Sequence, residues 1–316
     1  MFKHMHIIIT NQLTIYQNLA VMKRKMNFPL LLVCITLFCI PFAISSCNDE
    51  DEVKTNATIS TSSTPVLAVG ESATATINIV AEGIKSFKYY KVVDEVRAVE
   101  YDAINNLVKE GNKYTYSFSY TVQEFDDLHT LGFEFEIVDK ANVSYVLGLV
   151  VNTELSLKSS FVKFDWKVTA SEWLGMDVLA PHDAAYIYRF HEDGTYEVDM
   201  TPEYADNLHH FCYWVFKETP DNGDTLAVIR LVRKLRSGET AVDEYYDYRI
   251  VNATQAEMTM YWDIPVFGMF NIANTFTSQP KGAFQPYGTP EMASEVGNDP
   301  VMSCSTVDPA LLTIQK

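Results

Sequence analysis

The sequence predicts an all-β protein built from two domains. Short segments that alternate apolar and polar side chains recur along the chain, and this period of two is typical of half-buried strands. Turn signals rich in Gly, Asn and Asp separate the segments, and only 202–208 is predicted to form a short helix. The 316 residues are 47% hydrophobic, which is enough for two cores of ordinary size.

The charge of the chain limits its partners. It carries 24 Lys and Arg against 41 Asp and Glu, with a formal net charge of −17. Nucleic-acid binding relies on basic side chains that replace counterions along the phosphates, so nucleic acid is not expected as a partner. Most acidic side chains fall in predicted turns, which indicates solvation of the surface. The hydrophobic content excludes a disordered chain.

The first 46 residues are interpreted as a signal peptide with an upstream extension. The basic cluster 23–25 precedes an apolar run over 28–44, which is shorter than a membrane-spanning helix. The run ends in Ile44-Ser45-Ser46-Cys47, which resembles the lipobox of bacterial lipoproteins. That resemblance implies cleavage before Cys47, a diacylglyceryl group on its thiol and an acyl chain such as palmitate on its new amino group.

The start of translation is predicted to lie inside the printed sequence. Residues 1–21 delay the basic cluster, whereas Met22 is followed directly by Lys23, Arg24 and Lys25. This order is that of an ordinary signal peptide. We therefore predict initiation at Met22 or Met26 and not at Met1.

Residues 47–64 are predicted to be the lipidated cysteine and an acidic, polar tether. Asn48 is followed by four acids through Glu52, and this run resembles the surface-export signal of Bacteroidota lipoproteins. The resemblance implies an outer-membrane protein that is exposed on the cell surface and held to the membrane through Cys47. The alternative is that the acids only keep the tether solvated.

Residues 65–155 are predicted to form an antiparallel β-sandwich of roughly seven short strands. The clearest strand signals are 73–80, 114–120, 133–138 and 143–151. The stretch 132–142 ends a strand in the turn Asp139-Lys140-Ala141-Asn142, and it resembles the last hairpin of bacterial immunoglobulin-like domains. Only the architecture follows from this resemblance, because the antibody-type cysteine pair and core tryptophan are missing.

Residues 156–278 form a second predicted domain, which holds all four tryptophans. Its strands are expected at 164–168, 186–190, 195–200, 212–217, 226–232, 246–251, 258–262 and 270–276. Trp166 on the first strand, the hairpin turn at Asp193-Gly194 and Tyr248-Arg249-Ile250 resemble lipocalin-like domains of Bacteroidota lipoproteins. The resemblance implies a β-barrel, and a jelly-roll sandwich is the alternative. The tail 279–316 lacks periodicity and is expected to be poorly ordered.

The sequence contains no recognised catalytic, nucleotide-binding or metal-binding motif. We therefore expect a protein that is not an enzyme and has no catalytic residues, metal site or cofactor. His209 and His210 with Asp206 are the best cluster, but adjacent side chains on a strand point to opposite faces. Cys212 and Cys304 remain after processing, and either they pair as one disulfide or Cys212 is a buried free thiol.

Aromatic side chains are the better indication of a binding site. Tyr246 and Tyr248 share one face of a strand, and Trp214 lies in a strand with two apolar faces. Together with Trp262 they could line a barrel interior, while Trp173 in a loop-like segment is the candidate exposed platform. Aromatic rings can stack on sugars, and their polar tips orient a ligand.

Glycan binding is the first functional hypothesis. The predicted location and architecture resemble accessory lipoproteins of glycan-uptake systems, which implies a glycan and an outer-membrane transporter as partners. The glycan-binding hypothesis rests on analogy with proteins of similar location and architecture. The alternatives are a structural or adhesive surface protein without a small ligand, and a lipocalin-type carrier of a hydrophobic molecule.

Overall fold

The computed structural model describes residues 54–61, 66–219, 223–264 and 270–315. The predicted signal peptide, Cys47 and the acidic run that follows it lie outside the described residues. The described chain is an all-β protein with a β-sandwich and a nearly closed β-barrel, which confirms the predicted fold class. Within these ranges no helix is long and apolar enough to cross a membrane.

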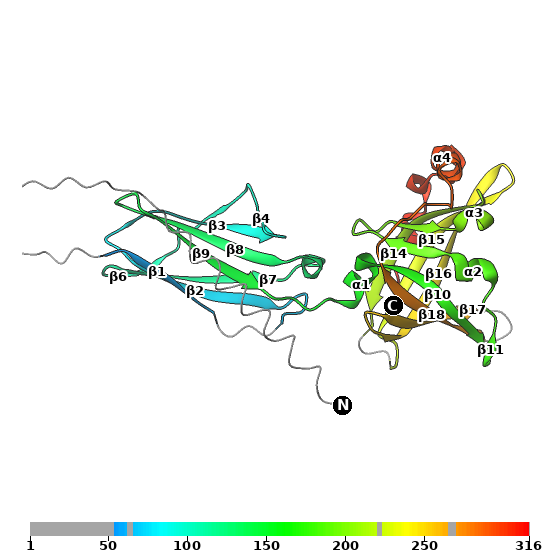
Figure 1. Cartoon of the computed structure of the whole chain (residues 1–316), viewed down its shortest axis with the longest axis horizontal. Helices are drawn as coiled ribbons and strands as arrows, with labels where there is room; N and C mark the ends of the chain where they lie inside the picture. Colours follow the sequence, from blue (N-terminus) through cyan, green and yellow to red (C-terminus); the bar gives the residue numbers. More distant parts are fainter. Residues whose placement is uncertain (1–53, 62–65, 220–222, 265–269, 316) are drawn as a thin grey trace, which may run out of the picture. The chain divides into compact units, whose positions relative to one another are not determined.

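The sandwich is made of two antiparallel sheets (Figure 1). The first has the order β1 (Asn56–Thr61), β2 (Ser72–Val80), β7 (Lys113–Thr121), β6 (Val108–Glu110). The second has the order β4 (Val96–Arg97), β3 (Ile84–Val93), β8 (Leu131–Asp139), β9 (Ser144–Val151), with β5 (Asp102–Ala103) also paired to β3. A 3-10 turn, η1 (Asp126–Leu128), precedes β8.

Alternating side chains build the core between these two sheets. Along β8 every second residue from Leu131 is buried, and Phe135 and Ile137 have no exposed surface. Ile77 of β2 and Phe118 of β7 belong to the same core cluster. The period of two in the sequence therefore marks the inner faces correctly.

Strand β1 corrects the predicted extent of the tether. Residues 56–61 were expected to belong to a polar linker ending at residue 64, but they pair with β2 from Asn56 opposite Val80 to Thr61 opposite Ala75. Ala57 and Ile59 pack against the core. Its inward residues, Ala57 and Ile59, alternate with polar residues such as Thr, which has good strand propensity, and two apolar side chains do not produce an apolar run.

The barrel is one antiparallel sheet that curls on itself. Its strands are β10 (Phe164–Trp173), β11 (Met176–Asp177), β12 (Ile187–Phe190), β13 (Tyr196–Asp199), β14 (His209–Glu218), β15 (Ala227–Ser237), β16 (Thr240–Ala253), β17 (Glu257–Ile264) and β18 (Phe270–Pro280). The order is β13-β12-β10-β18-β17-β16-β15-β14, with β11 paired to β10. A bridge between Thr195 and Tyr213 joins the two outer strands. A single curled sheet is a barrel and not the alternative jelly-roll sandwich.

Three short helices border the barrel strands: α1 (Leu157–Lys163), α2 (Pro181–Ala185) and α3 (Thr201–Tyr204). α1 places Phe161 in an aromatic cluster, with ring centroids 5.6 Å from Trp166 and 5.1 Å from Phe190. This cluster fills the interior beside the first residues of β10. α3 is shorter than the predicted helix 202–208, and residues 205–208 link it to strand β14, which begins at His209.

The tail differs from the poorly ordered segment that was expected. It forms α4 (Pro290–Asn298) and three 3-10 turns, η2 (Pro300–Met302), η3 (Cys304–Thr306) and η4 (Pro309–Leu312). Figure 1 shows α4 in orange-red beside the barrel strands. Val296, Met302 and Val307 are buried. A disulfide joins Cys304 to Cys212 of β14, so one of the two alternatives left open for these cysteines is found.

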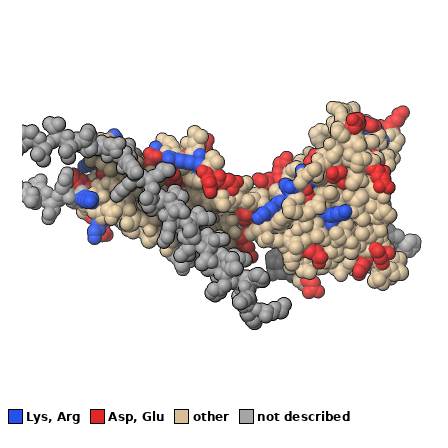
Figure 2. Space-filling view, viewed as in Figure 1, with Lys and Arg blue, Asp and Glu red and all other residues tan. Residues whose placement is uncertain are grey.

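The acidic side chains are dispersed over the barrel face shown in Figure 2. Two exposed or half-buried acids are in ion pairs, Asp247 with Arg230 and Asp263 with Arg249, whereas Asp165, which pairs with Arg189, is buried. Acidic side chains dispersed in this way are as expected if they keep the surface solvated and do not form a binding site.

Candidate functional site

The barrel encloses a cavity of about 640 Å³. Its walls come from strands β10 and β12–β18, the segment before α2, and α2 and α3. The lining residues are Val168, Ser171, Val178, Leu179, His182, Asp183, Tyr186, Tyr188, Tyr196, Tyr204, Asp206, His209, Phe211, Leu231, Arg233, Tyr246, Tyr248, Trp262, Ile272, Asn274 and Phe276. Small-molecule sites commonly have volumes of roughly 300–1,000 Å³, so this cavity is of a suitable size.

Three of the five predicted binding residues line the cavity. Tyr246 and Tyr248 lie on the inner face of β16, and Trp262 of β17 is the register partner of Tyr248. The ring centroids of Tyr246 and Trp262 are 5.3 Å apart in an edge-to-face arrangement. The structure thus places both tyrosines on one face of β16, as the alternation predicted, and this face lines the cavity.

Trp214 belongs to the filled part of the barrel and does not line the cavity. Its side chain is 4% exposed, and its Nε1 donates to the backbone oxygen of His191 at 3.0 Å. Phe190 lies 5.4 Å away, centroid to centroid. Trp214 is therefore a core residue, and the prediction that it lines the site was wrong.

Trp173 is also absent from the cavity walls. It is the last residue of β10, paired with Met176 of β11, and it is half-buried and not an exposed loop residue. The segment was expected to be a loop because Leu174 and Gly175 follow; these two residues form the tight turn of a hairpin, both with positive φ.

Two groups of cavity residues were missed by the sequence analysis. Tyr186 directly precedes β12 and Tyr188 is its second residue, and their spacing of two was a usable signal for a shared face. Arg233 follows Leu231 at the same spacing on β15. A charged residue on an apolar strand face is an informative signal, but strand alternation alone does not say which face is enclosed.

Arg233 is held inside the barrel by two neighbours. Its Nε and Nη2 donate to one oxygen of Glu244, its register partner, at 3.1 and 3.0 Å. Nη2 also donates to the Tyr246 hydroxyl at 2.8 Å. Burial acts to lower the pKa of Arg233, but the neighbouring Tyr246 and Glu244 outweigh it and the pKa is raised. The guanidinium therefore stays charged.

The cavity tyrosines are neutral and keep their hydroxyl protons. Burial raises the pKa of Tyr186 to about 12 and also raises the pKa values of Tyr188, Tyr196 and Tyr248. Among the described residues, none forms a hydrogen bond with the hydroxyls of Tyr188, Tyr196 and Tyr248. These hydroxyls are available to a ligand.

The more exposed part of the cavity carries two histidine–carboxylate pairs. His182 Nε2 lies 3.3 Å from Asp183, and these side chains are 52% and 47% exposed. His209 Nδ1 lies 3.4 Å from Asp206. Burial acts to raise the pKa of Asp206, but the His209 side chain and the backbone N–H groups of Leu208 and His209 together outweigh it, and the pKa is lowered. The cavity therefore opens to solvent beside α2, next to acidic groups.

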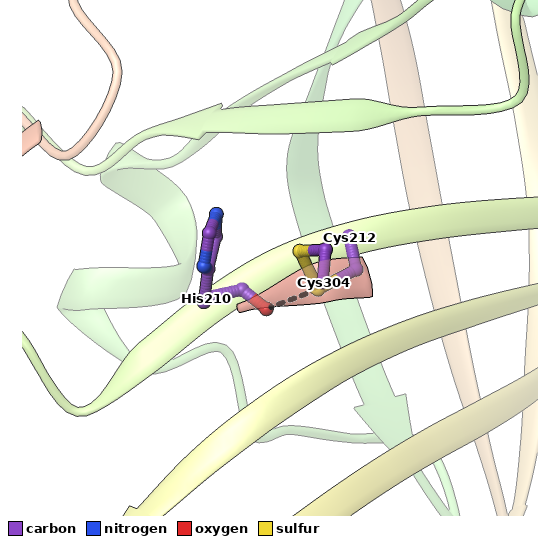
Figure 3. A group of neighbouring side chains, drawn as sticks. All are labelled: His210, Cys212 and Cys304. Carbon is purple, nitrogen blue, oxygen red and sulfur yellow. Dashed lines mark hydrogen bonds between the residues drawn. A yellow bond between two sulfur atoms is a disulfide. The ribbon is translucent and has the colours of Figure 1, made fainter. Parts of the chain in front are cut away.

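The histidine cluster that the sequence singled out is divided between two faces of β14. His209 lines the cavity, whereas His210 Nδ1 bonds to the backbone oxygen of Met302 in the tail at 2.7 Å. Potential ligand atoms of His210, Cys212 and Cys304 lie within 4.8 Å of one another (Figure 3). The two sulfurs are bonded to each other, so neither is the thiolate that binds a metal.

No protein-family model matches the chain, and no curated protein matches its sequence. Two solved structures resemble it weakly. Spo0M, a sporulation control protein from Bacillus subtilis, has 9% identity and a TM-score of 0.23, covering 72% of this chain and 91% of that one. A DUF4466 family protein from Parabacteroides merdae has 8% identity and a TM-score of 0.24, covering 72% and 99%. Both TM-scores are too low to support a conclusion about fold or function.

Proposed function

We propose that this protein is a non-catalytic, glycan-binding lipoprotein of the outer membrane, exposed on the cell surface. The lipobox-like sequence ending at Cys47 supports the lipid anchor, and the acids through Glu52 support surface export. The sandwich serves as an immunoglobulin-like spacer, and the lipocalin-like barrel binds the ligand. An outer-membrane transporter is the proposed partner that receives the glycan.

The observation that carries the proposal is the composition of the cavity wall. Tyr246, Tyr248 and Trp262 present aromatic faces, on which the C–H faces of sugar rings can stack. Asn274 and the tyrosine hydroxyls add donors and acceptors for sugar hydroxyls. A wall that mixes aromatic faces with polar tips suits a ligand that has both apolar and hydroxylated surfaces.

A carrier of a hydrophobic molecule is the second candidate. An apolar part of the same wall favours a hydrophobic ligand. It is formed by Val168, Leu231, Ile272 and Phe276. The unpartnered hydroxyls weigh against a purely hydrophobic ligand, because such a ligand would displace water from them without replacing its hydrogen bonds. A structural role without a small ligand would be expected of a filled barrel.

The test compares two neighbouring tyrosines of β16. Binding is measured with the full-length protein in detergent, by glycan-array screening and by calorimetry. A fatty acid is included as the probe for the carrier hypothesis. Tyr248→Ala removes a cavity ring and should weaken glycan binding at least about tenfold. Tyr245→Ala is the matched control, because Tyr245 is 48% exposed and lies on the opposite face. An array without bound glycans, or equal losses in both variants, would contradict the proposal.

A further inference from the structure

One end of the Arg233 guanidinium has no protein partner among the described residues. Its Nε and Nη2 are occupied by Glu244 and Tyr246, whereas no acceptor within the described ranges bonds to Nη1. The side chain is 23% exposed and lines the cavity. A partly buried guanidinium with two unused N–H groups is unfavourable unless a ligand or water accepts from them.

Tyrosine hydroxyls lie around the same charge. Tyr196 is 2% exposed, lines the cavity and has no hydrogen-bond partner for its hydroxyl in the described part of the chain. Burial raises the pKa of Tyr188, Tyr196 and Tyr248; the charge of Arg233 opposes this rise in each case, and the charge of Asp183 adds to it for Tyr188 and Tyr248. Tyr188, Tyr196 and Tyr248 line the same cavity as Arg233, so a ligand in the cavity can meet both the guanidinium and these hydroxyls.

We propose that the cavity selects glycans that carry an acidic sugar, with the sugar carboxylate accepting hydrogen bonds from Nη1 of Arg233 and from the surrounding tyrosine hydroxyls. The inference rests on the proposed glycan-binding function and names the class of sugar. A carboxylate only accepts hydrogen bonds, and here it meets groups that have protons to donate. Charge-assisted bonds from a guanidinium to a carboxylate are among the strongest in proteins.

The neighbouring carboxylates of the described chain do not occupy Nη1 of Arg233, which leaves it free to bind a ligand carboxylate. Glu244 uses a single oxygen for both of its bonds to Arg233, and it occupies only the Nε–Nη2 edge. Asp183 and Asp206 each have a histidine within 3.4 Å, and neither is bonded to Arg233 among the described residues. The free end of Arg233 is therefore the anion-binding part of the wall.

The experiment uses matched pairs of sugars with the full-length protein. Tetramers of galacturonic, glucuronic and mannuronic acid are titrated calorimetrically beside their carboxyl-reduced, neutral counterparts. We expect at least one acidic tetramer to bind about tenfold or more tightly than its counterpart. Arg233→Lys, which keeps the charge but lacks the fork, should remove most of that preference. Arg249→Gln is the control, because Arg249 pairs with Asp263 on the outer face of β16.

A second variant, Tyr196→Phe, keeps the proposal testable if Arg233→Lys does not fold. Tyr196→Phe removes one hydroxyl and keeps the ring, so it should lower affinity for the acidic tetramer about threefold to tenfold and affect the neutral one less. Equal binding of acidic and neutral sugars by the wild type would overturn the inference and leave glycan binding standing. Binding of none of these sugars, together with an array without hits, would overturn the proposed function as well.

Discussion

Trp214 and Trp262 are both barrel tryptophans, but Trp214 is packed in the core whereas Trp262 lines the cavity. Trp214 is 4% exposed, packs on Phe190 and donates its indole N–H to the backbone of His191. Trp262 is half-buried at the cavity wall. Removing a large side chain from a packed core leaves a void that its neighbours cannot fill.

We therefore expect Trp214→Ala to lower the free energy of unfolding of the barrel by about 3–5 kcal/mol. Trp262→Ala should cost clearly less, because its ring already faces open volume, and it should weaken ligand binding instead. Urea denaturation followed by far-ultraviolet circular dichroism checks the first expectation, and calorimetry checks the second. Equal destabilisation by the two substitutions would contradict the assignment of Trp214 to the core.

His210 provides a prediction about pH. Burial lowers its pKa below the ordinary value of 6.5, although its hydrogen bond with the backbone oxygen of Met302 opposes this shift. Because the folded pKa lies below the unfolded one, the unfolded chain binds more protons in that window, and stability is lost as the pH falls from above 6.5.

The variant His210→Asn retains a hydrogen-bond donor for the backbone oxygen of Met302 and removes the titratable imidazole. We expect its free energy of unfolding to change less than that of the wild type between about pH 7.5 and about pH 5.5. The carboxylates with lowered pKa values, such as Asp206 and Asp299, titrate below this window. Identical pH profiles for wild type and variant would show that His210 has no such role.

At the scale of elements, strand β14 shows how the tail is held. A register shift between Phe211 and Tyr213 lets Phe211 line the cavity and still directs Trp214 inward. Cys212, at the bulge, packs with Val232 and Val307 in a separate cluster. Both faces of this strand are apolar because the inner one meets the barrel interior and the outer one meets the tail.

The disulfide should stabilise this packing of the tail. Cys212 and Cys304 are 92 residues apart in sequence, and closing a loop of this kind typically contributes about 2–4 kcal/mol. We expect Cys212→Ala with Cys304→Ala to lower the unfolding midpoint and to speed proteolysis within 299–312. A reducing agent should reproduce the effect in the wild type and do nothing further in the variant. A wild-type midpoint that is insensitive to reduction would refute this account.

At the scale of the whole molecule, the proposed anchor is testable without a ligand. Labelled palmitate should be incorporated when the full chain is expressed in a Bacteroidota host, and Cys47→Ser should abolish the label and release the protein from membranes. Two acyl chains anchor a protein stably, whereas one alone is marginal. Cys39→Ser, within the predicted signal peptide, is the matched control and should keep the label.

Surface exposure is a separate readout of the same cells. Replacing the acids from Asp49 to Glu52 by Asn should preserve the lipid label but protect the protein from protease added to intact cells. Protease sensitivity that survives this change would mean that the acidic run is only a solvated tether.

Local patterns predicted the strands and their faces because strand periodicity is a property of neighbouring residues. Tyr246 and Tyr248 were placed on one face from their spacing alone, and the structure puts both in the cavity. Strand β1 was missed because its small and Thr-rich residues resemble a linker. The tail was misjudged because the surface that it covers, around Cys212 and Val232, comes from strands far away in sequence.

The sequence by itself determined the all-β class and the alternation that marks the inner faces of strands such as β8 and β16. Only the tertiary structure decided which faces enclose a cavity and which fill the core. The β15–β16 hairpin sets Arg233 opposite Glu244, and closure of the barrel adds tyrosines from β12 and β13 to the same cavity. It also places Trp214 against Phe161 of α1. These neighbours are set by long-range strand pairing, which no local period encodes.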